Sequence, residues 1–329
     1  MNVSQLKVDI RDKLSAGGGE NTALSVDTFW GDAEIINYIN QGYRKVTNAI
    51  RRARAEYFTR IIKSSDSALA ILGKSYDPAI LKMTTGVGTY QLPFDFVRII
   101  GIYDAREEDK IVFRGSSVVN QEMKSLYSLS NDNNISSGTV IYDIIGKRTL
   151  LVRPKPSEDF DIEIIYERLL DPLDEYTVGT IDVTKGSDTA TFTDADLANR
   201  FVVGDEIIVG SVTDAPIPSS SEIYVSIKSI DVGSNMVTFD SIYPFASATG
   251  AKYIRARVPE MPMQHIDALS HYGVYRGFSK GTNPNIESAH LAFNDFNSTL
   301  ADITSDVEVR QYQDMQFGQA YLEDLYDAE

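Results

Sequence analysis

The side chains best suited to acid–base or metal chemistry in this sequence are three histidines, His265, His271 and His290. His265 and His271 are six residues apart in a stretch with helical periodicity. They therefore lie on different faces of the helix and do not form the i, i+4 pair of a helical metal site. We expect structural or surface histidines. The chain has no cysteine, which excludes disulfides, thiolate metal sites and cysteine nucleophiles.

The other patterns that could do chemistry are incomplete. There is no G-x-S-x-G nucleophile turn and no Walker lysine loop, and the glycine runs at 17–19 and 86–88 lack the strand-to-helix context of a phosphate-binding loop. The stretch "DADLANR" at 194–200 lacks the glycine and the closing glutamate of a calcium loop. Acid pairs such as Glu107–Glu108 are expected by chance in a chain with 47 acidic residues. The sequence predicts no enzyme, with no catalytic residue, cofactor or metal site.

Two charge blocks of opposite sign stand out from this background. From Arg44 to Lys63 there are seven cations and one acid, whereas from Leu300 to Glu329 there are eight acids and one cation. Both blocks are compatible with solvated faces. They are also compatible with charges that meet across an interface between copies or partners, which the aromatic residues of the acidic segment favour. On this second interpretation, we expect an inter-subunit basic face at Arg44, Arg51, Arg52 and Arg54.

The last residues, "QYQDMQFGQAYLEDLYDAE", interleave aromatic and aliphatic side chains with acids and amides. A purely solubilising tail would not need these rings, which are typical anchors of interfaces. The segment is too polar to fold alone. We predict an extended arm over 307–329 that is disordered in the free protein and becomes ordered against a partner. Its candidate anchors are Tyr312, Phe317, Tyr321, Leu325 and Tyr326.

The segments that position these residues begin and end the chain as helices. Residues 6–14 place Leu6, Ile10 and Leu14 on one stripe, and residues 29–58 repeat apolar side chains at threes and fours. Acids begin the second of these helices and arginines end it, as the helix dipole favours. Helical periodicity returns after the prolines at 259 and 262, so we expect the N- and C-terminal helices to form one bundle.

Between the helices the apolar period is two. Residues 96–104, 110–113, 139–145, 149–154 and 160–169 read as strands, with a tight hairpin turn at Gly146-Lys147. Residues 116–127 are expected to form a short helix, and 128–138 a polar loop. Short alternating strands over 178–257 are typical of a small sandwich or barrel.

The predicted fold class is α+β, with two β insertions in a helix bundle. The predicted domains are N-terminal helices (1–88), a β-rich insertion (89–177), a small all-β domain (178–257), C-terminal helices (258–306) and the extended arm (307–329).

Composition sets the broad class. The hydrophobic content of 43% and charged content of 24% are those of a soluble globular protein. No apolar run approaches the roughly 20 residues of a membrane helix, and no apolar signal core follows the N-terminus. We expect a protein that is made in a cytoplasm. The net charge of −16 argues against a general nucleic-acid binder, although DNA could pass such a surface without sticking.

The order of these motifs resembles a known family. The stretch "FWGDAEIINYINQGYRKV" resembles the early tryptophan–acid–isoleucine helix of head-to-tail adaptor proteins of short-tailed bacteriophages, also called connector or head-completion proteins. The same family is resembled, in the spacing of apolar, glycine and proline residues, by the stretch "YDIIGKRTLLVRPKPSEDFDIEIIYERLLDPL". Its two C-terminal helices are resembled by "VPEMPMQHIDALSHYGVYRGFSK" and "ESAHLAFNDFNSTL". The block at 178–257 looks like an insertion found only in some members.

The resemblance implies a structural virion protein at the head–tail junction, assembled in the host cytoplasm. It implies a homo-oligomeric ring, typically of twelve copies, that sits beneath the portal protein after DNA packaging. Such a ring extends the DNA channel through which the genome is ejected, without specific DNA binding, and is the platform for the tail nozzle or tail tube. It also implies that the C-terminal arm docks on the portal or on a neighbouring subunit. No membrane partner is expected.

Two other classes of function stay open. A receptor- or carbohydrate-binding tail protein would use the β block at 178–257, although that block has no tryptophan for sugar stacking and the single tryptophan, Trp30, is far away in sequence. A cell-wall hydrolase would need two carboxylates that flank a cleft. The sequence shows no such pair.

Overall fold

The computed structural model describes residues 1–17, 30–54, 56–71, 74–106, 111–115, 138–193, 200–213, 224–231, 233–280 and 285–326, and the side chains of the last helix as far as Glu308. The chain divides into two compact units. One unit combines Met1–Ala55 with Pro172–Glu329, and the other is the continuous stretch Glu56–Asp171.

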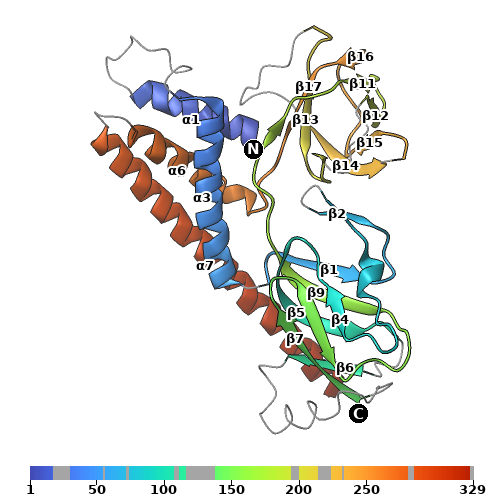
Figure 1. Cartoon of the computed structure of the whole chain (residues 1–329). Helices are drawn as coiled ribbons and strands as arrows, with labels where there is room; N and C mark the ends of the chain where they lie inside the picture. Colours follow the sequence, from blue (N-terminus) through green and yellow to red (C-terminus); the bar gives the residue numbers. More distant parts are fainter. Residues whose placement is uncertain are drawn as a thin grey trace. The chain divides into compact units, whose positions relative to one another are not determined.

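The first unit contains the helix bundle. Its helices are α1 (Val3–Gly17), α3 (Asp32–Ala53), α6 (Asp267–Phe278) and α7 (Ile286–Tyr326), with a short 3-10 helix η2 (Met263–His265) before α6. Helices α3 and α6 each pack against the three other helices, so the two ends of the chain form one bundle as expected (Figure 1). The predicted stripe of α1 is confirmed, because Leu6, Ile10 and Leu14 are fully buried.

Helix α3 is amphipathic along its whole length. Its buried side carries eight residues at helical spacing: Ile35, Tyr38, Ile39, Gly42, Tyr43, Val46, Thr47 and Ile50. Burial of this apolar stripe, rather than intrinsic propensity, is what stabilises a helix that contains so many β-branched residues. The opposite side is polar.

Two glycines let α1 approach α6 closely. A Cβ atom built on Gly273 would lie 2.4 Å from Ile10 Cδ1, and one built on Gly277 would lie 2.6 Å from Leu14 Cδ2. These two glycines are four residues apart on α6, as Ile10 and Leu14 are on α1. The i, i+4 pair of apolar side chains therefore fits over a matching pair of glycines.

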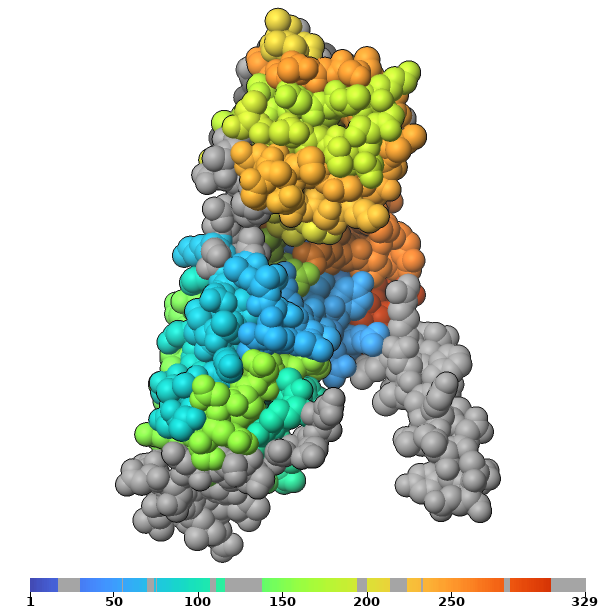
Figure 2. Space-filling model, turned by 90° about the vertical axis from the view of Figure 1, so that its right-hand side faces the viewer, coloured from blue at the N-terminus to red at the C-terminus, as the bar shows by residue number. Residues whose placement is uncertain are grey.

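The first unit also contains an eight-stranded antiparallel sheet. Its strand order is β10 (Glu175–Tyr176), β17 (Tyr253–Ala256), β13 (Glu206–Val209), β14 (Val225–Asp231), β15 (Met236–Phe239), β12 (Thr189–Phe192), β11 (Ile181–Val183) and β16 (Ala248–Ala251). Strands from the two ends of the 178–257 block are neighbours, so lime and orange segments lie side by side in Figure 2. The core contains Phe192, Phe239 and Tyr253. The second all-β block is confirmed.

The second unit is built on a seven-stranded sheet. Its order is β1 (Thr59–Lys63), β9 (Ile162–Arg168), β5 (Phe96–Asp104), β6 (Ile111–Gly115), β7 (Gly138–Ile145), β8 (Thr149–Arg153) and β4 (Thr89–Gln91). Only the β6–β7 pair is parallel among these strand pairs. A hairpin of β2 (Leu69–Ile71) and β3 (Lys74–Tyr76) and a 3-10 helix η1 (Pro78–Leu81) complete the unit.

The expected strands of this sheet are confirmed, as is the hairpin between β7 and β8. Gly146 has a φ of 63° there, in the left-handed region that a tight turn requires. The expected helix at 116–127 and the polar loop before Gly138 lie outside the described residues.

The structure differs from the expected boundaries at two places. Helix α3 ends at Ala53 and strand β1 begins at Thr59, so the stretch up to residue 58 is not all helical. Residues 59–88 contribute β1 to the seven-stranded sheet of the second unit and form the separate β2–β3 hairpin. Helix α7 continues to Tyr326, so residues 307–326 are helical where an extended arm was expected. This stretch contains no proline and a single glycine, and its Gln, Glu, Leu and Ala residues favour a helix.

Candidate functional site

The predicted basic face lies on the polar side of α3. Arg44 and Arg52 are exposed, whereas Arg51 and Arg54 are half-buried. Lys45 is also exposed, and its ammonium lies 5.7 Å from the centre of the Tyr272 ring. The structure therefore brings Arg44, Lys45 and Arg52 to one surface and leaves Arg51 and Arg54 less accessible to a partner.

The acids of α3 lie at the other end of the helix and are bound within the chain. Asp32 accepts hydrogen bonds from Lys7 Nζ at 3.0 Å and from Arg11. Glu34 accepts from Lys280 Nζ at 2.6 Å and from the Tyr38 hydroxyl at 2.5 Å. Burial alone would raise the pKa of both carboxyls, but these donors outweigh it and hold each pKa below its ordinary value.

The exposed arginines in the C-terminal half of α3, Arg44 and Arg52, in contrast to these acids, have no ion-pair partner among the described residues. The exposed half of α3 that follows Asn37 contains no acid at all. This surface therefore carries uncompensated positive charge on a chain whose net charge is −16.

The five predicted anchors lie on the last part of α7. The side chains of Tyr312, Phe317, Tyr321, Leu325 and Tyr326 are outside those that the structure describes. Their role as a docking segment stays a prediction.

The described part of α7 carries the first acids of the acidic block. Asp302 and Glu308 are exposed. Asp306, in contrast, accepts a hydrogen bond from Gln264 Nε2 at 2.7 Å and lies 2.6 Å from His265 Nε2. The contact between His265 and Asp306 thus connects η2 to α7, which is a structural role of the kind expected for this histidine.

A network of buried charges connects the bundle to the eight-stranded sheet within the first unit. The Lys7 ammonium lies 2.7 Å from Glu175 Oε2, and Ser4 donates to the other oxygen of the same carboxylate. Asn2 donates to Glu206 Oε2 at 2.6 Å. Helix α1 is thus attached to β10 and β13.

Strand β17 carries the second part of this network. Arg255 donates to both oxygens of Asp174, at 2.7 and 3.1 Å, and Arg257 Nε donates to Asp205 Oδ1 at 3.4 Å. Burial raises the pKa of Asp205 even though both arginines oppose the shift. Sequence reasoning missed this network. The signal was present in part, because Arg255 in β17 and Arg257 directly after it alternate with apolar residues.

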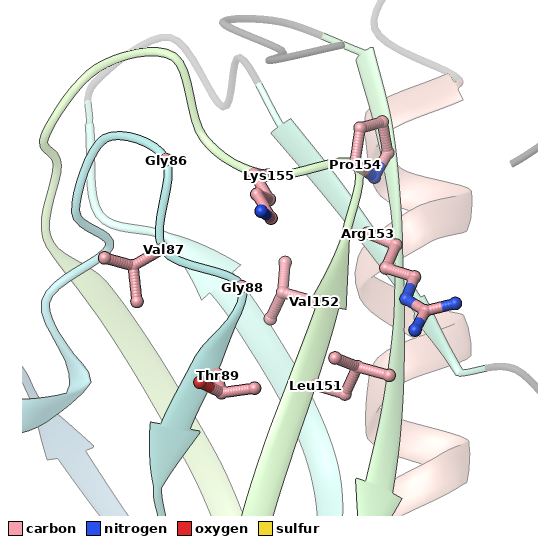
Figure 3. A pocket seen from close by; sticks show the side chains of 9 residues that line it. All are labelled: Gly86, Val87, Gly88, Thr89, Leu151, Val152, Arg153, Pro154 and Lys155. Atoms are coloured by element: carbon pink, nitrogen blue, oxygen red, sulfur yellow. The ribbon is translucent and has the colours of Figure 1, made fainter. Parts of the chain in front are cut away.

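A shallow hollow in the second unit contains one of the glycine runs considered for phosphate binding. It has a volume of about 570 Å³ and is lined by Gly86–Thr89 and by Leu151–Lys155. Lys155 projects between the glycine loop and Val152, while Arg153 points away (Figure 3). The N–H groups of Gly86 and Val87 donate to the carbonyls of Pro156 and Thr84, at 2.8 and 3.0 Å. These donors are therefore not available to an anion.

Aromatic side chains of the eight-stranded sheet are mostly internal. Phe239, Tyr243 and Tyr253 are each less than 5% exposed, and Phe245 is the exposed exception. A sugar-stacking platform needs exposed rings, so this arrangement does not favour the carbohydrate-binding alternative.

The remaining sequence patterns considered for chemistry are an acid pair, a candidate calcium loop and candidate metal sites. Residues 107–108 and 194–199 lie outside the described residues, so Glu107–Glu108 and most of "DADLANR" are not placed. Within the described ranges there is no group of three or more His, Asp or Glu side chains arranged to hold a metal ion. Nor does any helix there have the length and apolarity needed to cross a membrane.

Comparison with known proteins identifies the family. A family model described as SU10 adaptor protein matches residues 1–197, which is more than half of the 329-residue chain. No curated protein matches the chain. The matched part includes α1, α3, the whole unit Glu56–Asp171 and strands β10–β12. The chain therefore belongs to the SU10 adaptor protein family, and its role is that of a structural head-to-tail adaptor of a bacteriophage.

Proposed function

We propose that this chain assembles into a closed ring, typically of twelve copies, beneath the portal protein of the virion. The ring would extend the DNA channel and form the platform to which the tail nozzle or tail tube attaches. The match to the adaptor family over residues 1–197 carries this proposal. Heterologous contacts between identical subunits close into rings of this kind.

The charge of the chain is suited to a DNA conduit. Carboxylates along a channel repel phosphate, so the genome can pass during ejection without being held. The chain has 47 acidic and 31 basic residues, so its net charge is −16. Acids that remain exposed in the ring and face the channel would contribute to this repulsion.

The segment 311–329 is proposed to dock on the portal or on a neighbouring copy through Tyr312, Phe317, Tyr321, Leu325 and Tyr326. Ordering a segment costs roughly 1–2 kcal/mol per backbone residue, so docking requires that several of these apolar side chains are buried together. Docking should also protect the segment from protease. Equal cleavage rates in the free and assembled protein would contradict this part of the proposal.

The test is the mass of the assembly, measured by light scattering after size-exclusion chromatography. The full chain is measured alone and after mixing with the matching portal ring. We expect a portal complex with about twelve added copies, and loss of this complex when residues 311–329 are removed. A stable trimer that ignores the portal would contradict the proposal and favour a receptor-binding tail protein.

A matched pair of variants separates the anchors from the length of the segment. One variant replaces Tyr312, Phe317, Tyr321, Leu325 and Tyr326 with alanine. The control replaces Gln311, Gln313, Gln316 and Gln319, which lie in the same segment, with alanine. Only the first variant should lose the portal complex.

A further inference from the structure

Two helices of the same bundle present opposite charges on their exposed faces. The exposed face of α3 carries Arg44, Lys45 and Arg52. On the exposed face of α7, Asp and Glu are the charged residues of the described part, because no Lys or Arg occurs between Ile286 and Glu308. The exposed acids on α7 are Glu287, Asp295, Asp302 and Glu308.

These two faces do not neutralise each other within one copy. Helices α3 and α7 pack against each other in the bundle (Figure 1), and the side of α7 that is buried carries Phe296, Ile303 and Val307. The acids lie on the opposite, exposed side. In the described part of the chain, no ion pair involves the exposed cations Arg44, Lys45 and Arg52 of α3 or the exposed acids of α7. Charges that face away from each other in one copy can meet only between copies.

The spacing of the charges is also compatible. Arg44 and Arg52 are eight residues apart, or about 12 Å along the helix axis. Glu287 and Asp295 have the same separation, and Asp302 follows Asp295 after seven residues, about 10 Å. Two arginines on one helix can therefore face two acids on another without a change in either helix.

We infer that α3 of one copy contacts α7 of the neighbouring copy through these charges. The contact is heterologous, since it joins two different surfaces, and it rests on the ring of the proposed function. A second copy is favoured over DNA as the occupant because the chain itself supplies acids at the matching spacing. Complementary charges of this kind set orientation and suppress wrong pairings.

The experiment uses charge reversal in the full chain. The first variant is Arg44→Glu with Arg52→Glu, and the second is Asp295→Lys with Asp302→Lys. Each places like charges at the contact, so each should assemble on the portal ring at least about tenfold more weakly than the natural chain. Assembly is measured by sedimentation with the portal ring over a range of adaptor concentrations.

Rescue identifies the partner surface. A 1:1 mixture of the two variants, and a single chain that carries all four substitutions, both restore opposite charges at every contact. Both should recover assembly. The control variant, Lys185→Glu with Lys228→Glu, changes the net charge by the same amount as the first variant at two exposed positions, one in the turn after β11 and one on β14, and it should assemble normally.

The outcomes separate this inference from the proposed function. If the natural chain joins the portal and the first two variants join it equally well, the inferred α3–α7 contact is wrong, whereas the proposed ring is not contradicted. If the variants lose assembly but neither rescue restores it, α3 meets another partner, such as DNA or the portal, and the inference is again wrong. A natural chain that forms no assembly, alone or with the portal, contradicts both. Circular dichroism spectra confirm that each variant is folded.

Discussion

Among single residues, Asp104 shows how a buried carboxylate is kept charged. It ends strand β5, its side chain is inaccessible to solvent, and it accepts hydrogen bonds from Arg106 Nε at 2.8 Å and from the Ile111 N–H at 3.1 Å. Burial would raise its pKa, but the donors outweigh burial and hold the pKa below its ordinary value of 3.8. Arg106 in turn lies over the Phe160 ring, 4.2 Å from its centre.

Replacing this carboxylate should make the second unit less stable in a pH-dependent way. Since the pKa of Asp104 is lower in the folded state, its stabilisation is present above pH 3.8 and is lost as the pH falls through the depressed value. Asp104→Asn should therefore cost about 2 kcal/mol of unfolding free energy at pH 7, and the difference should shrink below pH 3.8.

Urea unfolding followed by circular dichroism at several pH values measures this effect. Asp143→Asn, on an exposed position of β7, is the matched control and should change little. A loss for Asp104→Asn that is constant down to pH 3 would show that the charge of Asp104 is not what stabilises this turn.

Among the elements, helix α6 has glycines at positions where neighbouring helices leave no room for a side chain. Gly273 and Gly277 accept Ile10 and Leu14 of α1, and Gly42 of α3 lies against Tyr272. A side chain at any of these glycines would meet a buried neighbour. Close approach of the helices, rather than flexibility, is therefore the reason for glycine at these positions.

An added methyl group should accordingly push α1 and α6 apart. In Gly273→Ala the new Cβ would lie 2.4 Å from Ile10 Cδ1 and 3.0 Å from Ile10 Cγ1, and Ile10 is fully buried, so its side chain must shift within the core. Alanine favours a helix by about 1 kcal/mol, but overpacking costs about 1–3 kcal/mol, so we expect a net loss of about 1 kcal/mol in the unfolding free energy.

A double variant tests the cause of this loss. Ile10→Val removes the Cδ1 atom that the new methyl would meet, so Gly273→Ala with Ile10→Val should lose less stability than the sum of the two single variants. Strict additivity in thermal or urea unfolding would mean that the two side chains do not meet. Gly31→Ala, where no atom lies within 4 Å of the added Cβ, is the control.

Across the whole molecule, buried charges connect parts of the chain that are distant in sequence. Lys7 and Glu175 are 168 residues apart, yet their charged atoms lie 2.7 Å apart. Lys7 also reaches Asp32 at the start of α3. One ammonium group thus joins α1, α3 and β10 in the first unit, and does so at a position with almost no access to water.

Removing this ammonium should destabilise the first unit strongly. Lys7→Met leaves the Glu175 carboxylate largely buried without its cation, which typically costs about 3–5 kcal/mol. Lys63→Met is the control, because Lys63 and Glu163 form a more exposed ion pair whose loss should cost about 0.5 kcal/mol or less. Similar unfolding midpoints in urea for the two variants would contradict the assigned role of Lys7.

The sequence by itself determined the class of the protein and most of its elements. Apolar periodicity is a local property, so the helices α1, α3 and α6 and the strands β5, β7, β8 and β9 could be predicted from it. The order of the same motifs was sufficient to suggest the adaptor family, which the family match over residues 1–197 confirms. The basic block of α3 was also visible, because consecutive arginines are a local feature.

Only the tertiary structure decided which strands are neighbours and which charges are hidden. Strand β1 lies beside β9, about a hundred residues later in the chain, so the end of α3 at Ala53 could not be read from periodicity that continues to Phe58. The same holds for Lys7, a surface residue by its type, and for the acids of α7, which face away from α3. Burial and pairing depend on contacts between residues far apart in sequence, and no local pattern records them.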